Sequence, residues 1–257
     1  MQENVFVRNK KGLKLATIVE RPSKKGKFPS VLMLHGFKGY KEEETYKGLA
    51  KILLKKNIAS VRFDASGFGD SEGDFTKEYR LSNYVSDSES VYAWMIKQSF
   101  IDKKSIGVMG QSMGGALALI FSSNHPEIKA VVSVSAPDIF ATRDDFGKML
   151  GKWKKKGYIE IESSRMNGKI KVPFDYALDA ARYDIKKYAA KSAPAKLFIL
   201  GLDDVTVIPD QTRSVFNKAA KPKKLIEVKN MDHFYKNDPV ILSKVNKYVV
   251  EYLLRYL

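Results

Sequence analysis

Cysteine is absent from this chain of 257 residues, and histidine occurs only three times. The lack of cysteine excludes disulfide bonds, thiolate metal sites and a cysteine nucleophile. The N-terminal residues also lack the continuous apolar segment of a secretory signal, so the two absences together favour a cytoplasmic protein. No apolar run reaches the roughly 20 residues that cross a bilayer, and we therefore expect no stable insertion in a membrane.

Acidic residues are few compared with basic ones: 29 Asp and Glu stand against 45 Lys and Arg, which gives a net charge of +16. The basic residues are dispersed in short clusters such as "RNKKGLK" and "KPKKL", mostly in predicted turns and helix faces. No RNA-binding signature or recognition helix accompanies them, so we expect no nucleic-acid partner. The clusters favour a solvated lysine-rich surface, and a surface that attracts anionic partners is the alternative.

Short apolar runs alternate with helical patterns along most of the chain. Apolar and polar residues alternate on both sides of Lys11 and Gly12, which predicts an antiparallel hairpin over residues 5–20. Further strands are predicted at 30–36, 58–64, 105–110, 130–136, 196–201 and 225–230, and helices at 43–57, 84–98, 113–124 and 239–257. The nearly continuous apolar strands are typical of a sheet buried on both faces. The sequence therefore predicts an α/β fold with a mostly parallel central sheet and helices on both faces.

One segment interrupts this alternation. From Pro137 to Ser192 no core strand is apparent, and aromatic residues such as Phe140, Phe146 and Trp153 occur among many lysines. A long insertion after a core strand favours a helical cap over 137–192, on a core formed by 1–136 and 193–257. Helices packed away from the site are the alternative. The cap aromatics, Trp153 among them, fit either a substrate pocket or ordinary core packing.

Gly110, Ser112 and Gly114 form a Gly-x-Ser-x-Gly pattern between a predicted strand and a predicted helix. Alone the pattern is weakly specific, because it also fits a tight structural turn. Its position favours function, since a serine on a sharp strand-to-helix turn needs flanking glycines to avoid clashes and presents its hydroxyl to solvent. Ser112 is therefore predicted to be a nucleophile.

The base for this serine follows by elimination among the three histidines. His125 lies thirteen residues further along the predicted helix, roughly 20 Å from Ser112 at 1.5 Å per residue. His35 precedes the serine, whereas in this architecture the acid and then the histidine follow it. Only His233, after the last predicted strand, satisfies that order.

The acid is expected between the serine and His233, at the end of a late strand. Asp203 and Asp204 both follow the strand at 196–201, and periodicity does not separate them. A carboxylate at this place would hold the imidazole in the correct tautomer. Two backbone N–H groups should complete the site as an oxyanion hole, one from Met113 and one from Phe37 in the "HGFKG" turn.

These features resemble the serine α/β-hydrolase superfamily, and within it the small esterases related to feruloyl (cinnamoyl) esterases and to serine aminopeptidase-like hydrolases. The matching stretches are "LHGFKGYKEEE", "IASVRFDASGFGDSEGDF", "IGVMGQSMGGALAL", "LGLDDVTVIP" and "MDHFY". The resemblance implies an α/β-hydrolase fold with Ser112 as nucleophile and His233 as base. It favours Asp204 over Asp203 as the acid, because family members place it three residues after the glycine of "G-x-x-D".

The same resemblance assigns the oxyanion positions to Phe37 and Met113 and implies a structural role for Asp64 and Asp70. It matches no residue of the predicted cap, so the substrate-binding residues stay unassigned, with Trp153 as a candidate.

We therefore expect a serine carboxylesterase that hydrolyses small-molecule esters through an acyl-enzyme, without a metal or organic cofactor. The resemblance implies aromatic esters of the cinnamoyl type as possible substrates. A serine aminopeptidase-like peptidase is the nearest alternative, and a non-catalytic hydrolase-fold binding protein is an alternative of another class. A homodimer is an option for its assembly.

Overall fold

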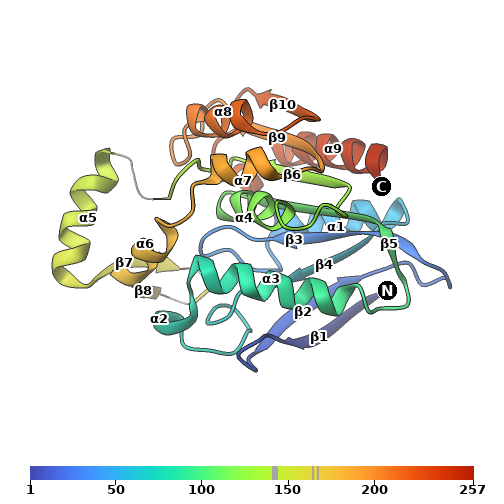
Figure 1. The fold of residues 1–257 in the computed structure, drawn as a ribbon, viewed down its shortest axis with the longest axis horizontal. Coiled ribbons are helices and arrows are strands. Elements are labelled where there is room, and N and C mark those ends of the chain that lie inside the picture. The colour runs from blue at the N-terminus through green and yellow to red at the C-terminus, as the bar shows by residue number, and fades with distance from the viewer. Residues whose placement is uncertain (141–143, 164, 167) are drawn as a thin grey trace.

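A twisted eight-stranded sheet crosses the centre of the computed structural model, which describes residues 1–140, 144–163, 165–166 and 168–257, with only the backbone at 144–148 (Figure 1). The strand order is β1-β2-β4-β3-β5-β6-β9-β10. The strands are β1 (Gln2–Arg8), β2 (Lys14–Glu20), β3 (Phe28–Leu34), β4 (Ala59–Phe63), β5 (Ile101–Gln111), β6 (Ala130–Val134), β9 (Ala195–Gly201) and β10 (Lys223–Val228). β2 is antiparallel to both β1 and β4, and every other pair in this sheet is parallel. The mostly parallel sheet predicted from the sequence is confirmed.

The N-terminal hairpin forms one edge of the sheet, as predicted. Asn9 closes its turn, because its side-chain oxygen accepts hydrogen bonds from the N–H groups of Lys11 (2.9 Å) and Leu13 (3.0 Å). Gly12 has a φ of 82°, a conformation that glycine adopts without steric cost. The turn chemistry thus sets the register in which β1 pairs with β2.

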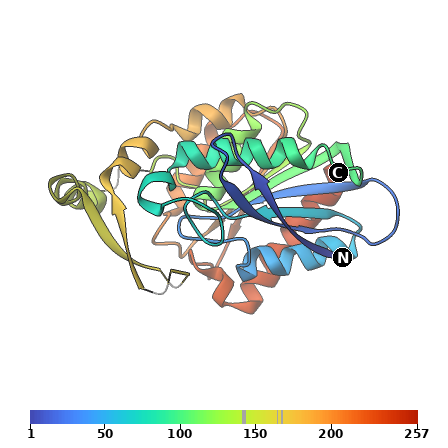
Figure 2. The same ribbon diagram turned by 90° about the horizontal axis from the view of Figure 1, so that it is seen from below.

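Helices cover both faces of the sheet (Figure 2). α1 (Glu44–Lys55) and α9 (Pro239–Tyr256) pack on one face. α3 (Leu81–Met95), α4 (Met113–Ser122), α7 (Ile185–Lys191) and α8 (Pro209–Lys218) pack on the other. Side chains of a strand alternate between these two layers: Leu32 faces α3 and α4, whereas Val31 and Met33 face α1 and α9. Burial on both faces explains why the core strands read as continuous apolar runs.

The segment between β6 and β9 departs from the prediction. It contains α5 (Asp144–Lys156), α6 (Phe174–Ala180) and α7, but also a two-stranded antiparallel sheet of β7 (Tyr158–Ser163) and β8 (Gly168–Pro173). The segment expected to be a helical cap thus contains helices and, in addition, a β-hairpin that was not predicted. The overlooked signal is the alternation of apolar and polar residues in "YIEIE" and "KIKV", which is a strand pattern. α5, β7 and β8 project together at one end of the molecule (Figure 1). The segment from α5 to α6 (144–180) is the cap.

Two short elements complete the chain: α2 (Phe75–Glu78) and the single-turn helix η1 (Tyr235–Asn237). α7 lies within the range predicted as cap, yet it packs against α4 and α8 of the core. No helix in the described part of the chain combines the length and apolar character needed to cross a membrane.

Candidate active site

Ser112 lies on a strained turn between β5 and α4. Its backbone has a φ of 57° and a ψ of −124°, a conformation that non-glycine residues rarely adopt. The turn is held by a hydrogen bond of 2.8 Å from the Ser112 N–H to the Val134 carbonyl oxygen on the neighbouring strand. The half-buried side chain stands at the N-terminus of α4, where the helix dipole favours negative charge.

The glycines of the Gly-x-Ser-x-Gly pattern are needed because backbones meet at this turn. A Cβ atom on Gly110 would lie 2.2 Å from the Gly114 carbonyl oxygen, and one on Gly114 would lie 1.9 Å from the Leu34 carbonyl oxygen. Both positions therefore exclude any larger residue. This close approach brings the end of β3 next to Ser112.

Three side chains that are far apart in the sequence form one hydrogen-bonded chain. The His233 Nε2 atom lies 3.0 Å from the Ser112 Oγ atom, and its Nδ1 atom lies 2.8 Å from the Asp204 Oδ2 atom. The Asp204 carboxylate can only accept a hydrogen bond, so the proton between the two groups is carried by His233 Nδ1. Nε2 is then unprotonated and can accept a hydrogen bond from the Ser112 hydroxyl. His233 and Asp204 are both buried, at 8% and 2% exposure.

The structure brings Asp204, and not Asp203, to the His233 ring. The second carboxylate oxygen of Asp204 accepts hydrogen bonds from the N–H groups of Thr206 (2.9 Å) and Val207 (2.8 Å), which fixes the carboxylate plane. The Asp203 side chain is exposed to solvent. The choice between the two aspartates, which periodicity left open, follows from the turn after β9.

Gln111 is a residue of the site that the sequence analysis did not single out. Its side-chain amide donates a 2.7 Å hydrogen bond to the His233 backbone carbonyl oxygen. The residue before Ser112 thus holds the loop that carries the imidazole. Its only signal in the sequence is its place in the Gly-x-Ser-x-Gly pattern, which constrains neither its chemistry nor its partner.

The two predicted oxyanion donors face the same cavity as Ser112. Phe37 lies in a turn closed by a 2.9 Å hydrogen bond from the Gly39 N–H to the Gly36 carbonyl oxygen. Lys38, with a φ of 59°, donates its N–H to the buried Tyr79 hydroxyl at 2.9 Å and so fixes this turn. In the part of the chain that the structure describes, the N–H groups of Phe37 and Met113 form none of the backbone–backbone hydrogen bonds of turns, loops and helix caps.

Asp64 and Asp70, expected to be structural, bind the buried Lys41 ammonium group instead of His233. The Lys41 Nζ atom lies 2.8 Å from the Asp64 Oδ2 atom and also contacts the Asp70 carboxylate. The hydrogen bond from Lys41 lowers the pKa of Asp70. The Lys41 N–H donates to the other Asp64 oxygen at 2.7 Å, which anchors the chain two residues after the turn that carries Phe37.

Among the contacts that join the cap to these core loops, two involve the basic side chains of Lys38 and Arg165. Lys38 donates from Nζ to the Glu162 carbonyl oxygen at the end of β7, at 2.7 Å. Arg165, in the turn after β7, pairs with Asp70 and lies over the Tyr40 ring, 5.3 Å from its centroid. The tip of the cap hairpin therefore contacts the segment that carries Phe37.

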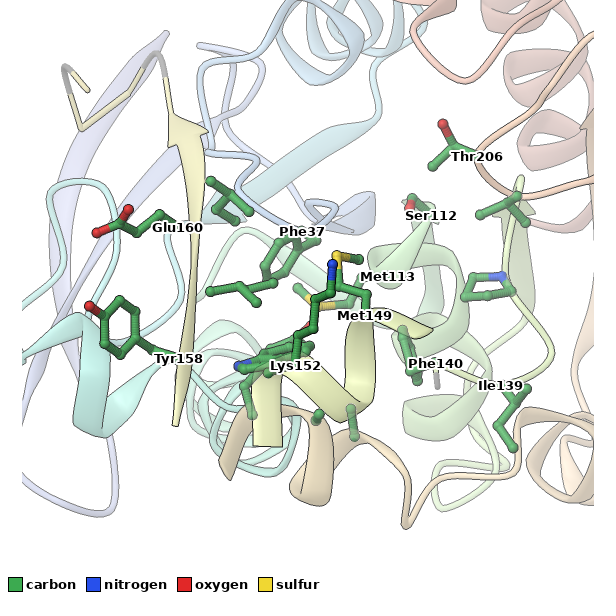
Figure 3. Close-up of a pocket in the computed structure, with 18 of the residues that line it drawn as sticks. Phe37, Ser112, Met113, Ile139, Phe140, Met149, Lys152, Tyr158, Glu160 and Thr206 are labelled. Atoms are coloured by element: carbon green, nitrogen blue, oxygen red, sulfur yellow. The ribbon is translucent and has the colours of Figure 1, made fainter. Parts of the chain in front are cut away.

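A cavity of about 680 Å³ lies above Ser112, between the ends of the core strands and the cap (Figure 3). Its lining is mostly apolar and aromatic. The core contributes Phe37, Ser112, Met113, Pro137, Ile139, Phe140, Thr206, Val207 and Gln211; the cap contributes Met149, Lys152, Trp153, Lys156, Tyr158, Ile159, Glu160, Ile161, Tyr176, Ala177 and Ala180.

Trp153 combines the two roles that the sequence left open. It is buried and donates its indole N–H to the Val172 carbonyl oxygen of β8 at 2.9 Å, and its ring also lines the cavity. Phe140 lines the cavity as well, whereas the side chain of Phe146 lies outside the described residues. Among residues 1–140, 144–163, 165–166 and 168–257, no three His, Asp or Glu side chains gather as a metal site.

The ring nitrogens of the other two histidines form hydrogen bonds with groups other than Ser112. His35 is buried, with Nδ1–H donating to the Gly36 carbonyl oxygen (2.8 Å) and Nε2 accepting from the Ala65 N–H (3.1 Å). Burial lowers the pKa of His35 and keeps it neutral. His125, beyond the end of α4, binds Glu89 (2.8 Å) and Glu127 (2.9 Å).

His125 gives a prediction for the pH dependence of stability. Burial opposes its charged form, but the hydrogen bonds to Glu89 and Glu127 outweigh burial and raise the pKa of His125 above its ordinary value. The folded state then binds the proton more tightly than the unfolded state, so this stabilisation is full below about pH 6.5 and is lost as pH rises through the folded pKa. We expect His125→Gln to destabilise the protein more at about pH 5.5 than at about pH 8.5 in urea unfolding. Equal losses at the two pH values would contradict this assignment.

Comparison with known proteins identifies the family to which this chain belongs. A family model described as Hydrolase_4, serine aminopeptidase S33, matches residues 27–161. An uncharacterized 31.7 kDa protein of Escherichia coli, from the traX-finO intergenic region, is 25% identical over 243 residues, with 81% of this chain and 84% of that protein covered.

Solved structures share the fold at low sequence identity. The α/β hydrolase GrgF from Penicillium sp. sh18 superposes with a TM-score of 0.86 at 14% identity, covering 100% of this chain and 99% of that one. Est1E from Butyrivibrio proteoclasticus, solved with ferulic acid bound, gives a TM-score of 0.76 at 19% identity, covering 97% and 99%. The predicted α/β-hydrolase fold is thereby confirmed, and the chain belongs to the serine aminopeptidase S33 family of α/β hydrolases.

Proposed function

We propose that this hydrolase is a serine carboxylesterase that acts through an acyl-enzyme on Ser112. The observation that carries the proposal is the hydrogen-bonded chain from Ser112 through His233 to Asp204, which opens into an apolar cavity. A buried carboxylate, an oriented imidazole and a hydroxyl that faces the cavity are the three parts that nucleophilic catalysis by serine requires.

The reaction follows from the atoms at the site. As the Ser112 oxygen attacks the ester carbonyl carbon, its proton passes to His233 Nε2, and Asp204 stabilises the resulting imidazolium. The carbonyl oxygen becomes an oxyanion, which accepts hydrogen bonds from the Phe37 and Met113 N–H groups. The tetrahedral intermediate collapses, and the alcohol leaves with the proton from His233. Water, deprotonated by His233, then attacks the acyl carbon; the bond to the Ser112 oxygen breaks, that oxygen takes the proton back from His233, and the acid is released.

The shape and lining of the cavity support an apolar or aromatic acyl group. A volume of about 680 Å³ accommodates a phenylpropenoid acid, and Phe37, Trp153 and Tyr176 offer aromatic faces. The bound ferulic acid belongs to Est1E, a structural neighbour, and it makes hydroxycinnamoyl esters reasonable first substrates for this chain. Turnover of methyl ferulate beside aliphatic esters of several lengths tests that narrower proposal.

Aminopeptidase activity is the second candidate, because the matching family model is described as serine aminopeptidase S33. The same serine chemistry cleaves amides, but an aminopeptidase must also bind the free amino group of its substrate, for which a carboxylate is the suitable partner. Glu160 is the one acidic residue among the residues lining the described cavity, and Lys152 and Lys156 line it too. This charge balance favours esters over N-terminal peptides.

The test compares labelling with turnover. We expect a fluorophosphonate probe to label the protein at Ser112 and to abolish hydrolysis of p-nitrophenyl butyrate with one-to-one stoichiometry. Amino-acid p-nitroanilides, assayed in parallel, should be turned over much more slowly. Absence of labelling would favour a non-catalytic binding protein, and faster cleavage of the anilides would favour the peptidase.

A further inference from the structure

Two lysines of the cap line the cavity although the rest of its wall is largely apolar. The C-terminal part of α5 carries Lys152, Lys154, Lys155 and Lys156. Only the first and the last of these four line the cavity. They are four residues apart and therefore lie on the same face of the helix, one turn from each other.

Neither lysine is neutralised by an acidic partner that the structure describes. Lys152 takes part in no ion pair among the described side chains. The Lys156 ammonium group lies over the Tyr158 ring, 4.5 Å from its centroid. Glu160, the acidic residue among the described lining, is exposed and lies with Tyr158 on the other side of β7 from Phe37 in the view of Figure 3.

Lys152 lies next to apolar side chains of the cavity. Met149, one turn before it on α5, and Phe37 and Met113 of the core line the same cavity (Figure 3). The Lys152 side chain is itself exposed, so its charge lies at the solvent side of this apolar wall, and salt weakens its pairing with an anion. The wall thus combines a long apolar surface beside Ser112 with a cationic edge formed by two lysines.

We propose that the preferred substrates are esters whose apolar acyl chain ends in an anionic group, such as a carboxylate, which Lys152 binds. The inference rests on the proposed esterase function and specifies its substrate class. The ester carbonyl lies at Ser112 and the chain along the apolar wall, while the distal anion pairs with the ammonium group. Lys156, one turn further, adds positive potential at the rim.

Matched esters test the inference. The rates to compare are kcat/KM for p-nitrophenyl hexanoate against mono-p-nitrophenyl adipate, and for p-nitrophenyl octanoate against mono-p-nitrophenyl suberate. We expect the wild type to prefer the carboxylate ester by about three- to tenfold at one of these lengths, and salt to reduce that preference. Lys152→Met should bring the ratio of the two rates close to one.

Lys155→Met is the matched control, since it removes the same charge from the same helix outside the cavity wall. It should preserve both the ratio and the rate on the neutral ester. An equal fall of the ratio in both variants would assign the preference to the diffuse charge of the cap and overturn the role of Lys152. A wild type that hydrolyses neutral esters without preference for the anionic ones would overturn the inference and leave the esterase intact. Failure to hydrolyse any of the four esters would instead overturn the proposed function.

Discussion

Replacing Ser112 with alanine is expected to lower kcat for ester hydrolysis by about 10⁵- to 10⁶-fold. The oxygen that attacks the carbonyl is removed, and no acyl-enzyme can form. Residual hydrolysis would come from water activated by His233, with the Phe37 and Met113 N–H groups still able to bind the oxyanion. Alanine keeps the Cβ atom and fits the same strained turn, so the fold should be retained. The measurement is the steady-state rate on p-nitrophenyl butyrate, with circular dichroism as the check on folding.

Ser123→Ala is the control for that experiment. Ser123 lies at the other end of α4, and its hydroxyl donates to the Ile120 carbonyl oxygen outside the cavity. Its loss should leave kcat within about twofold of the wild type, since surface substitutions away from special features change little. A folded Ser112→Ala protein that kept a tenth of the wild-type rate would show that another group attacks the ester.

Replacing Asp204 with asparagine is expected to lower kcat by about 10⁴-fold. The asparagine carbonyl oxygen can still accept from the Thr206 and Val207 N–H groups, which leaves the amide nitrogen facing His233 Nδ1. An N–H donor at that place favours the tautomer with its proton on Nε2, and that nitrogen can no longer accept from Ser112. The change therefore acts on protonation while preserving the shape of the site.

Asp203→Asn provides a control that differs by one position. Its carboxylate is exposed and stands outside the contact with His233, so its rate should stay close to that of the wild type. Rates on a short p-nitrophenyl ester, measured from acidic to alkaline pH, separate the two variants. Comparable losses in both would argue against Asp204 as the partner of the imidazole.

The core of the fold could be predicted from the sequence because its strands are buried on both faces. Continuous apolar runs such as Val31 to Leu34 can only be placed inside a covered sheet, and the helical periods between them supply the cover. Ser112 could be singled out as the candidate nucleophile for a related reason. The turn at Ser112 leaves no room for a Cβ atom on Gly110 or Gly114, so both positions must be glycine and the turn is recognisable in the sequence.

The cap and the cavity wall could not be predicted in the same way. Its hairpin has one solvated face, so "YIEIE" resembles an exposed polar segment as much as a strand. The partners of Gln111 and Lys41 lie far away in sequence, and hydrogen bonds of this kind leave no periodic pattern. Four lysines lie in the C-terminal part of α5, and only Lys152 and Lys156 line the cavity. Which of them do so depends on how α5 is rotated against β7, and tertiary packing decides that rotation.

The contacts of Lys38 with Glu162 and of Arg165 with Asp70 set a rule for building chimaeras. An exchange of the cap for that of a related hydrolase would remove both partners on the cap side while leaving Lys38 beside Phe37. Such a transplant would change the pocket and at the same time remove the contacts that the cap makes with the segment presenting one of the proposed oxyanion donors. We therefore expect substrate range and catalytic rate to change together in such a chimaera, and Lys38 and Asp70, the core partners of these contacts, are the positions to adapt to the foreign cap.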